Sequence, residues 1–419
     1  MADWKVLTLR DKYKIVRKVV LGEGASAVVY KGLDVQACRN VAVKLYKHTE
    51  TDGSPRRSAL EEFRKSVTVL KRLCSIDDDE ERQAMRRLTT FSYDAGTLSH
   101  CIAVTWRRSN TSVASAESAT IANPILDEVD TSNCYVRLLD YSCTETGEPG
   151  LDEHEKLLYL VLELGEESLE ERLQRHRTRG ESLSVKELRE LQWALVCIVW
   201  GLHAVGFVHM DIKPQNIMRF RENGADHWKL IDLDGAMETG REIRPEQVTF
   251  TPEYMPPELA KAWVAWTSGD PSYRLTMSRL MDVWSIGMCS LEAIFLQPVL
   301  RPWFEEWKKE TGSEEKFFKW LADYDTEPIL HGDMHEMLAG MDKDMCDLLE
   351  TMLAKDPDTR SSINECLTHP WFSSVHRALI GDLKAGAASG HLSQTEAWHS
   401  PEAAVEKKIG PKSKLCTVM

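Results

Sequence analysis

Two short polar stretches carry the side chains that could do chemistry. Their sequences are H-M-D-I-K-P-Q-N at 209–216 and K-L-I-D-L-D-G at 229–235. Together they supply the carboxylates of Asp211 and Asp232, the ammonium group of Lys213 and the carboxamide of Asn216. An acid that orients a hydroxyl, a cation for a transferring charge and oxygen ligands for Mg²⁺ are what phosphoryl transfer needs. The alternative is a pair of Asn/Asp-rich turns, and two neighbouring stretches of this composition favour the phosphoryl-transfer site.

A glycine-bearing stretch near the start of the chain offers a second place where phosphates could bind. It consists of Leu21, Gly22, Glu23, Gly24, Ala25, Ser26, Ala27, Val28 and Val29. Glycine allows backbone N–H groups to approach a phosphate closely, and a valine that follows can cover an aromatic base. The alternative is a hairpin turn that binds nothing, and this stretch alone does not decide between the two.

Lys44 follows the glycine-bearing stretch on a short run, Val41-Ala42-Val43, whose valines indicate a buried strand. A buried ammonium group needs a charged partner, and a phosphate is one. The alternative is an edge-strand lysine that points to water. Because the lysine and the glycine-bearing stretch occur together, the sequence favours a nucleotide site.

The composition is that of a soluble globular protein. The 419 residues are 42% hydrophobic and 28% charged, with a formal net charge of −14. An acidic chain lacks the basic face of a nucleic-acid binder, so we expect no nucleic-acid partner. The ten cysteines include no C-x-x-C pair, which argues against a zinc framework and favours a reducing compartment. The longest apolar run, 193–202, is too short to span a bilayer.

The elements that must position these residues change character along the chain. Strand-like runs occur at 13–20, 27–33, 40–46, 135–141 and 157–164. An amphipathic helix is expected at 58–73, with Leu60, Phe63, Val67, Leu70 and Leu73 on one face. An insertion is expected at about 75–133, because 109–124 is rich in Ser, Ala and Thr. The first part of the chain therefore predicts a small antiparallel lobe of five strands and one helix.

The second part of the chain is mainly helical. Helices are expected at 168–176, 184–205, 280–295, 303–320, 334–353 and 362–367. Beyond residue 372 the chain is rich in Ala, Ser, Gly and Lys and is expected to lack a core. A β-rich front and a helical back predict two lobes with a seam near Leu162–Glu166.

These motifs, in this order, resemble those of the protein kinase superfamily over about 13–372. The resemblance implies that the glycine-bearing stretch, Ala42, Lys44 and Glu163 bind ATP, with Glu163 in a hinge at Glu163–Gly165. Asp211 stands at the Asp of the H-R-D motif and would be the catalytic base. Lys213 matches the Ser/Thr-kinase form of that loop. Asn216 and Asp232 match the Mg²⁺ ligands.

Further matches lie in the second half. The sequence M-P-P-E at 255–258 resembles the A-P-E end of the family's activation segment, and Asp282 and Arg360 match two structural anchors. The resemblance implies an ion pair between Arg360 and Glu258. It also implies that Thr251 hydrogen-bonds near Asp211 and Lys213.

The chain departs from the family pattern at several positions. Met210 replaces the Arg of H-R-D, Leu233 and Asp234 replace the Phe and Gly of D-F-G, and Ala27 replaces the third glycine of the loop. Alignment of 63–73 on the family places Ser66 where a glutamate should pair with Lys44. Glu62 lies one turn earlier on the same face and is the alternative partner.

The last four residues, Cys416 to Met419, match a C-a-a-X prenylation signal that favours farnesyl. Lys407, Lys408, Lys412 and Lys414 precede it, and a basic cluster strengthens the weak membrane binding of one lipid. The alternative is a plain disordered tail. We expect a cytoplasmic protein that attaches peripherally to the cytoplasmic face of a membrane.

The sequence therefore predicts an α+β, bilobal protein-kinase-like fold with a small antiparallel β lobe and a larger helical lobe. The expected domains are an extension at 1–12, a kinase domain at 13–372 with lobes at about 13–165 and 166–372, and a tail at 373–419. ATP and Mg²⁺ are the expected cofactors, and Ser or Thr residues of proteins are the expected substrates. A pseudokinase scaffold on the same fold is the rival. A small-molecule kinase is disfavoured by 254–258, which resembles a peptide-substrate segment. The oligomeric state does not follow from the sequence.

Overall fold

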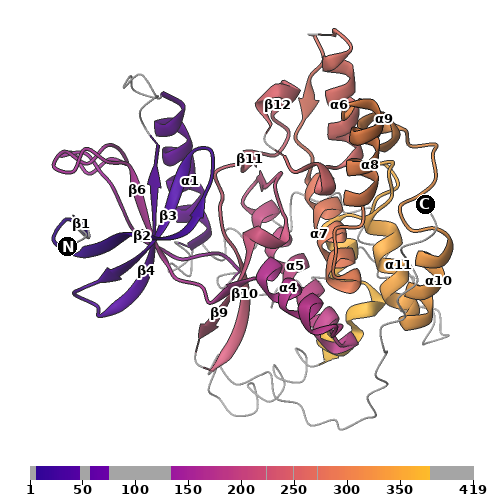
Figure 1. Cartoon of the computed structure of the whole chain (residues 1–419), viewed down its shortest axis with the longest axis horizontal. Helices are drawn as coiled ribbons and strands as arrows, with labels where there is room; N and C mark the ends of the chain where they lie inside the picture. Colours follow the sequence, from indigo (N-terminus) through magenta and orange to yellow (C-terminus); the bar gives the residue numbers. More distant parts are fainter. Residues whose placement is uncertain are drawn as a thin grey trace, which may run out of the picture. The chain divides into compact units, whose positions relative to one another are not determined.

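The structure is a computed structural model that describes residues 6–47, 57–74, 134–222, 224–248, 250–270 and 272–377 (Figure 1). The expected insertion at about 75–133 and the tail from 378, with Cys416 and its lysines, lie outside the described residues. The chain forms two compact units. Unit 1 comprises Met1–Asp77, Ser132–Leu169 and Pro214–Ala236, and unit 2 comprises Asp78–Thr131, Glu170–Lys213 and Met237–Met419. The domain boundaries expected from the sequence stay predictions.

Unit 1 contains a six-stranded antiparallel sheet. Its strands are β1 (Val6–Leu9), β2 (Tyr13–Glu23), β3 (Ala27–Asp34), β4 (Arg39–Tyr46), β5 (Leu138–Tyr141) and β6 (Tyr159–Glu163), in the order β1-β2-β3-β4-β6-β5. The expectation of five strands is wrong by one. The missed strand, β1, is only four residues long and pairs with β2 across a turn in which Arg10 and Asp11 take positive φ. Glycine would have been a stronger sequence signal for a left-handed turn than either of these residue types.

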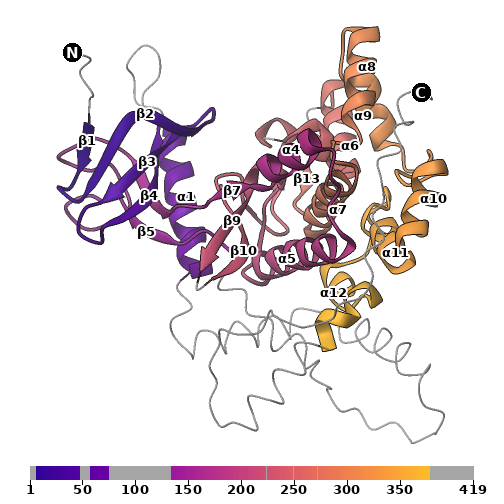
Figure 2. The same ribbon diagram turned by 60° about the horizontal axis from the view of Figure 1, so that its bottom comes forward.

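The core of this sheet is a compact apolar cluster. Its fully buried members are Leu9, Tyr13, Ile15, Val41, Val43, Tyr159 and Val161. The helix α1 (Arg57–Cys74) lies alongside β5 (Figure 2). The face predicted for this helix is confirmed, because Phe63, Val67, Leu70 and Leu73 are buried, while Leu60 is half-buried. Burying one stripe of an amphipathic helix is what fixes it to a sheet.

A second, three-stranded sheet completes unit 1. It consists of β7 (Glu167–Ser168), β9 (Ile217–Glu222) and β10 (Ala225–Leu230), in the order β10-β9-β7. The β9–β10 hairpin pairs Ile217 with Leu230 at its open end. Part of the run expected as a strand at 135–141 joins this region instead, because Tyr135 forms a bridge to Leu230 and β5 begins only at Leu138.

Unit 2 is mainly helical. Its helices are α4 (Leu169–Arg179), α5 (Val185–Ala204), α6 (Pro257–Thr267), α7 (Arg279–Phe295), α8 (Arg301–Thr311), α9 (Glu315–Ala322), α10 (Gly332–Met341), α11 (Lys343–Met352) and α12 (Ile363–Leu367). Short strands are β8 (Phe207–Val208), β11 (Met237–Glu238), β12 (Glu242–Ile243) and β13 (Leu275–Thr276), and 3₁₀ turns are η1 (Pro214–Asn216, in unit 1), η2 (Pro245–Gln247), η3 (Pro252–Tyr254) and η4 (Pro370–Phe372). Within the described ranges, no helix combines the length and the apolar character needed to cross a membrane.

Two helices expected from the sequence are each two helices. The expected helix 303–320 is broken between α8 and α9, where Gly312 takes a left-handed φ of 69° and its N–H closes α8 on the Lys308 carbonyl. The expected helix 334–353 is broken at Asp342, whose extended backbone ends α10 and whose side chain caps the first turn of α11. Glycine at a helix end and aspartate at a helix start are strong local signals. Sequence analysis missed both signals because apolar residues continue in helical spacing across each break.

Candidate active site

The glycine-bearing stretch forms the end of the β2–β3 hairpin in unit 1. Gly24 N–H donates to the Ala27 carbonyl at 2.9 Å, and Lys47 Nζ binds Glu23 at 2.8 Å and the Gly24 carbonyl at 3.0 Å. A Cβ added to Gly22 would meet no heavy atom of the described residues within 4 Å. Packing within this part of the chain therefore does not require glycine at that position.

Lys44 lies on β4 with 7% of its surface exposed. Its Nζ is 2.7 Å from Asp232 Oδ1 and 2.8 Å from Asp234 Oδ2. Burial by itself lowers the pKa of Lys44, but the neighbouring Tyr46, Asp234 and Asp232 outweigh it and hold that pKa well above its ordinary value. Lys44 is therefore a buried cation with carboxylate partners.

Asp234, which sequence analysis treated only as a lost glycine, is the centre of this group. Its Oδ1 accepts hydrogen bonds from Tyr46 Oη at 2.8 Å and Ser66 Oγ at 2.6 Å. Ser66 lies on α1 and is buried. The available signal was the coincidence of an extra acid at 234 with a missing acid at 66. The alternative partner Glu62 is half-buried on α1, and its pairing with Lys44 stays a prediction.

The β9–β10 hairpin brings the two expected metal ligands to neighbouring positions. Asn216 ends η1 just before β9, Asp232 follows β10, and the Ile231 N–H donates to the Asn216 carbonyl at 2.9 Å. Asp232 has a left-handed φ of 60°, and 47% of its side chain is exposed. One carboxylate and one carboxamide oxygen fit Mg²⁺, which takes few protein ligands and fills its octahedron with water and phosphate oxygens.

Asp211, Lys213 and Thr251 form a hydrogen-bonded triangle in unit 2. Lys213 Nζ is 2.7 Å from Asp211 Oδ2, and Thr251 Oγ donates to Asp211 Oδ1 at 2.9 Å. The same hydroxyl accepts from Lys213 Nζ at 3.0 Å. Thr251 therefore lies where the resemblance implied, and it fixes an aspartate and a lysine side by side.

The backbone next to this triangle is fixed by Asp282 at the start of α7, which has no exposed surface. Its carboxylate accepts from the N–H groups of His209, at 2.8 and 3.1 Å, and of Met210, at 3.0 Å, and it lies 3.0 Å from His203 Nε2. Met210 has a φ of 72°, a conformation that costs an L-residue about 1–2 kcal/mol. The residue is 4% exposed. His203 was missed by sequence analysis because it sits inside the apolar helix α5.

The expected pair of Glu258 and Arg360 is present as a bidentate ion pair, with N–O distances of 2.8 and 2.9 Å. Arg360 also donates to the carbonyls of Ala354, Leu280 and Lys355. This guanidinium therefore ties the start of α6 to the segments around α7 and α11.

Glu163, which is expected to bind ATP, is the last residue of β6. Its carboxylate contacts two basic residues of unit 1. Oε1 accepts from Lys229 Nζ and from the Arg137 N–H, both at 2.8 Å, and Oε2 lies 3.1 Å from the Arg137 guanidinium. Ala42, the other expected ATP contact on this sheet, is buried on β4 and pairs with Leu162 of β6.

The expected site residues thus fall into two groups, each assembled within one unit. Unit 1 holds the glycine-bearing stretch, Lys44, Asn216 and Asp232, and unit 2 holds Asp211 and Lys213 with their supports. Cys416 lies outside the described residues.

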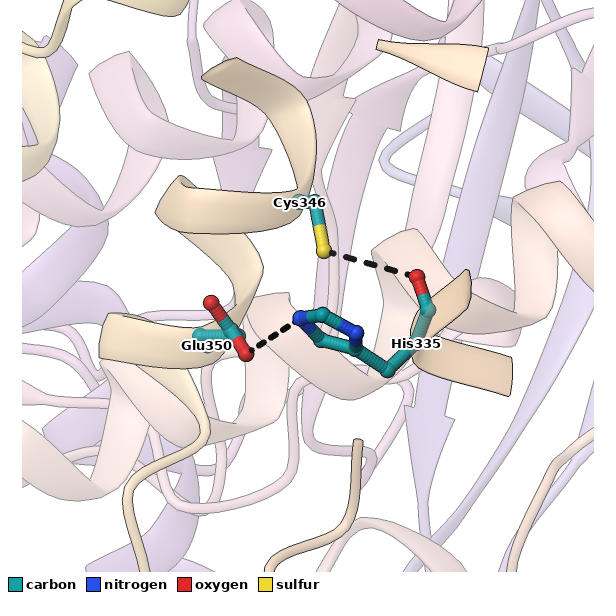
Figure 3. Close-up of side chains that lie close together, drawn as sticks. All are labelled: His335, Cys346 and Glu350. Atoms are coloured by element: carbon teal, nitrogen blue, oxygen red, sulfur yellow. Dashed lines mark hydrogen bonds and ion pairs between the residues drawn. The ribbon is translucent and has the colours of Figure 1, made fainter. Parts of the chain in front are cut away.

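A different set of metal-ligand types, His335, Cys346 and Glu350, lies at α10 and α11 (Figure 3). His335 Nε2 is 3.0 Å from Glu350, and the Cys346 thiol is directed at the His335 carbonyl, with a sulfur–oxygen distance of 3.9 Å. Burial raises the pKa of Cys346, which favours the thiol over the thiolate that binds zinc. We interpret the group as a helix–helix contact.

Comparison with known proteins connects these motifs to one family. A family model described as the protein kinase domain matches residues 123–372. The chain is 28% identical over 200 residues to serine/threonine-protein kinase 17A of Oryctolagus cuniculus, covering 46% of this chain and 43% of that protein. It is 24% identical over 241 residues to mitogen-activated protein kinase KSS1 of Saccharomyces cerevisiae, covering 52% and 62%, respectively. It is 26% identical over 264 residues to cyclin-dependent kinase B2-1 of Oryza sativa subsp. japonica, covering 58% and 73%, respectively.

The matched range has two consequences. The chain spans 43% and 62% of the lengths of the first two relatives. The glycine-bearing stretch and Lys44 precede the range that the family model matches. Their assignment to a nucleotide site therefore depends on the geometry of unit 1.

Proposed function

The chain belongs to the protein kinase family, and from that premise we propose that it is an active protein serine/threonine kinase that transfers the γ-phosphate of ATP to proteins. The observation that carries the proposal is the triangle of Asp211, Lys213 and Thr251. A carboxylate held next to an ammonium group can accept the proton of a substrate hydroxyl while the cation stabilises the charge of the transferring phosphoryl group.

The residues of unit 1 would handle the nucleotide. Lys44 would hold the phosphates, and the open backbone around Gly22 and Gly24 supports a close approach of phosphate oxygens. Asn216 and Asp232 would hold Mg²⁺, which neutralises charge on the phosphates when it is bound. The exposure of Asp232 supports this role, because it leaves the carboxylate open to an incoming metal ion.

The rival function is a pseudokinase scaffold, and three departures favour it: Met210, Asp234 and Ser66. Each of them has a structural account that leaves the phosphate- and metal-binding residues in place. Met210 is buried on a backbone that Asp282 supports, and Ser66 and Asp234 bind each other next to Lys44. Active phosphotransfer is therefore the better-supported function.

The decisive experiment uses the purified protein with labelled ATP·Mg²⁺ and a Ser/Thr peptide library, beside an Asp211→Asn variant. We expect phosphopeptides from the natural protein and a loss of roughly 10²-fold or more from the variant. Equal signals from both proteins would indicate a contaminating kinase. ATP binding with no transfer by either protein would favour the scaffold.

We also propose that the kinase is held peripherally at a cytoplasmic membrane face by a farnesyl group on Cys416. The proposal rests on Cys416 within a C-a-a-X sequence and on the four lysines that precede it. One farnesyl group binds weakly, and each nearby lysine adds about 1 kcal/mol at an anionic leaflet.

A further inference from the structure

Two departures from the kinase pattern meet in space. The pattern has a glutamate where this chain has Ser66 and a glycine where it has Asp234. The two residues are separated by 168 positions in the chain, yet Ser66 Oγ lies 2.6 Å from Asp234 Oδ1. A lost carboxylate on α1 thus coincides with a gained carboxylate beside it.

We propose that Asp234 is the positioning residue of Lys44, supplying from the segment after β10 the carboxylate that the kinase pattern takes from a helix. This inference rests on the proposed function, because the role of Lys44 is to hold the phosphates of ATP. Asp234 acts through Lys44 and contacts no substrate.

The two oxygens of Asp234 make different contacts. Oδ1 accepts from Tyr46 Oη and Ser66 Oγ, and Oδ2 faces Lys44 Nζ at 2.8 Å. Two hydroxyl donors and one cation hold a carboxylate whose side chain is only 15% exposed. Charge pairs in such a dry environment are stronger than pairs in water, and each group is costly to leave alone.

Asp232 also accepts a hydrogen bond from Lys44 Nζ, at 2.7 Å, but it has a second expected role. Its side chain is 47% exposed, and it stands among the expected Mg²⁺ ligands. A carboxylate that binds a metal ion has less charge to offer the lysine. Asp234, which is anchored to β4 through Tyr46 and to α1 through Ser66, keeps Lys44 in place.

The backbone accepts the exchange of glycine for aspartate without strain. Among the described residues with positive φ are Met210 and Asp232, but not Asp234. Only a left-handed conformation at 234 would have required glycine. A glutamate at 66 beside Asp234 would place two carboxylates together, and like charges repel. The serine at 66 and the aspartate at 234 are therefore compatible with each other. Introducing only one of them into the family pattern would leave Lys44 with two repelling carboxylates or with none on this side.

A purely structural anchor is the alternative: Asp234 would then tie Tyr46 to Ser66, and Lys44 would be indifferent to its charge. A charge-removing variant of the same size separates these possibilities. Asp234→Asn keeps the shape and the hydrogen-bonding capacity but removes the negative charge. Asp140→Asn is the matched control, because Asp140 accepts from Tyr13 Oη at 2.9 Å and lies near Arg10 and Lys12 in the same unit.

The experiment measures kcat/KM for ATP, Kd for ATP·Mg²⁺ and the midpoint of thermal unfolding for each variant. We expect Asp234→Asn to lose at least about tenfold in kcat/KM and Asp140→Asn to lose none. Ser66→Glu alone should also lose activity through like-charge repulsion. The double variant Ser66→Glu/Asp234→Gly should recover at least about tenfold over Ser66→Glu, because it restores the pattern's carboxylate.

The outcomes distinguish this inference from the proposed function. Full activity in Asp234→Asn, or a folded double variant no better than Ser66→Glu, would overturn the inference and leave the kinase assignment standing. If the natural protein binds ATP without transferring phosphate, the weaker Kd expected for Asp234→Asn still tests the inference. A natural protein that neither binds nor transfers would overturn both.

Discussion

The pairing of one lysine with two carboxylates gives the residue scale its sharpest prediction. Lys44→Met would unseat the phosphates, and Asp232→Asn would weaken the metal site while leaving Asp234 to hold Lys44. We expect each variant to lose roughly 10²-fold or more in kcat. Initial rates with labelled ATP·Mg²⁺ check this, with the exposed Glu305→Gln variant on α8 as a control. Retained activity in Asp232→Asn would remove Asp232 from the metal site.

Individual site residues were predictable from the sequence where a motif is contiguous. Asp211, Lys213 and Asn216 occupy one stretch, so their spacing could be matched directly. The carboxylate partner of Lys44 could not be found in this way. It lies 190 positions away at Asp234, and a prediction guided by the family pattern looked for it on α1.

At the scale of elements, the loop before η1 and the segment between β10 and α6 predict how the activity would be regulated. Met210 stands where the family has an arginine that grips a phosphate, and its apolar side chain is buried. The resemblance to the family also implies a Thr or Ser that could carry that phosphate four residues before Thr251, where this chain has Gln247. We therefore expect activity without phosphorylation of this segment. Treatment with a phosphatase, checked by intact mass, should leave the rate equal to that of the mock-treated protein, and a silenced enzyme would contradict this.

The contact between η3 and α7 predicts a pH dependence of stability. Tyr254 donates to Glu292, and burial raises the pKa of that carboxyl to about 7, although the hydrogen bond opposes the shift. Between the ordinary value of 4.5 and about 7, the folded protein keeps a proton that the unfolded chain releases. The free energy of unfolding therefore falls as pH rises through this window.

Thermal unfolding at pH 5 and at pH 8 measures this contribution. We expect the melting temperature of Glu292→Gln to change less between the two pH values than that of the natural protein. Glu305→Gln, an exposed substitution, should leave the natural difference intact. Identical pH dependence in Glu292→Gln and the natural protein would exclude Glu292 as the source.

Secondary structure was predictable where one physical signal dominated. The β-branched run of β4 and the apolar face of α1 were found because burial imposes their periodicity. The breaks at Gly312 and Asp342 were not, because apolar residues continue in helical spacing on both sides of each break. β9 and β10 were missed because each is only six residues long and has at most one β-branched residue, so the usual strand signal is weak.

At the scale of the whole molecule, the acidic charge and the tail predict how the protein distributes in a cell. The net charge of −14 would repel an anionic leaflet, whereas the tail carries the lysines and Cys416. We expect Cys416→Ser to move the protein from the membrane fraction to the soluble one without changing its rate on a soluble peptide. Replacing the four lysines with glutamine should weaken attachment partly, and high salt should have the same effect.

Intact mass of the C-terminal peptide decides the lipid proposal. A peptide that ends at Cys416 and carries a farnesyl group is the expected product. An unmodified peptide ending at Met419, from cells with an active prenyltransferase, would remove the proposal while leaving the kinase assignment untouched.

The carboxylate of Asp282 also imposes an order on biosynthesis. The N–H groups of His209 and Met210 bind a side chain that lies 73 and 72 positions later in the chain. A ribosome needs roughly 4–15 s to add that many residues. Until α7 leaves the ribosome, the left-handed backbone at Met210 lacks its acceptor, so the loop that carries Asp211 matures late in translation. A nascent chain stalled before residue 282 should therefore hold unit 2 in a form that proteases cut near 209–213 and that released, full-length protein resists.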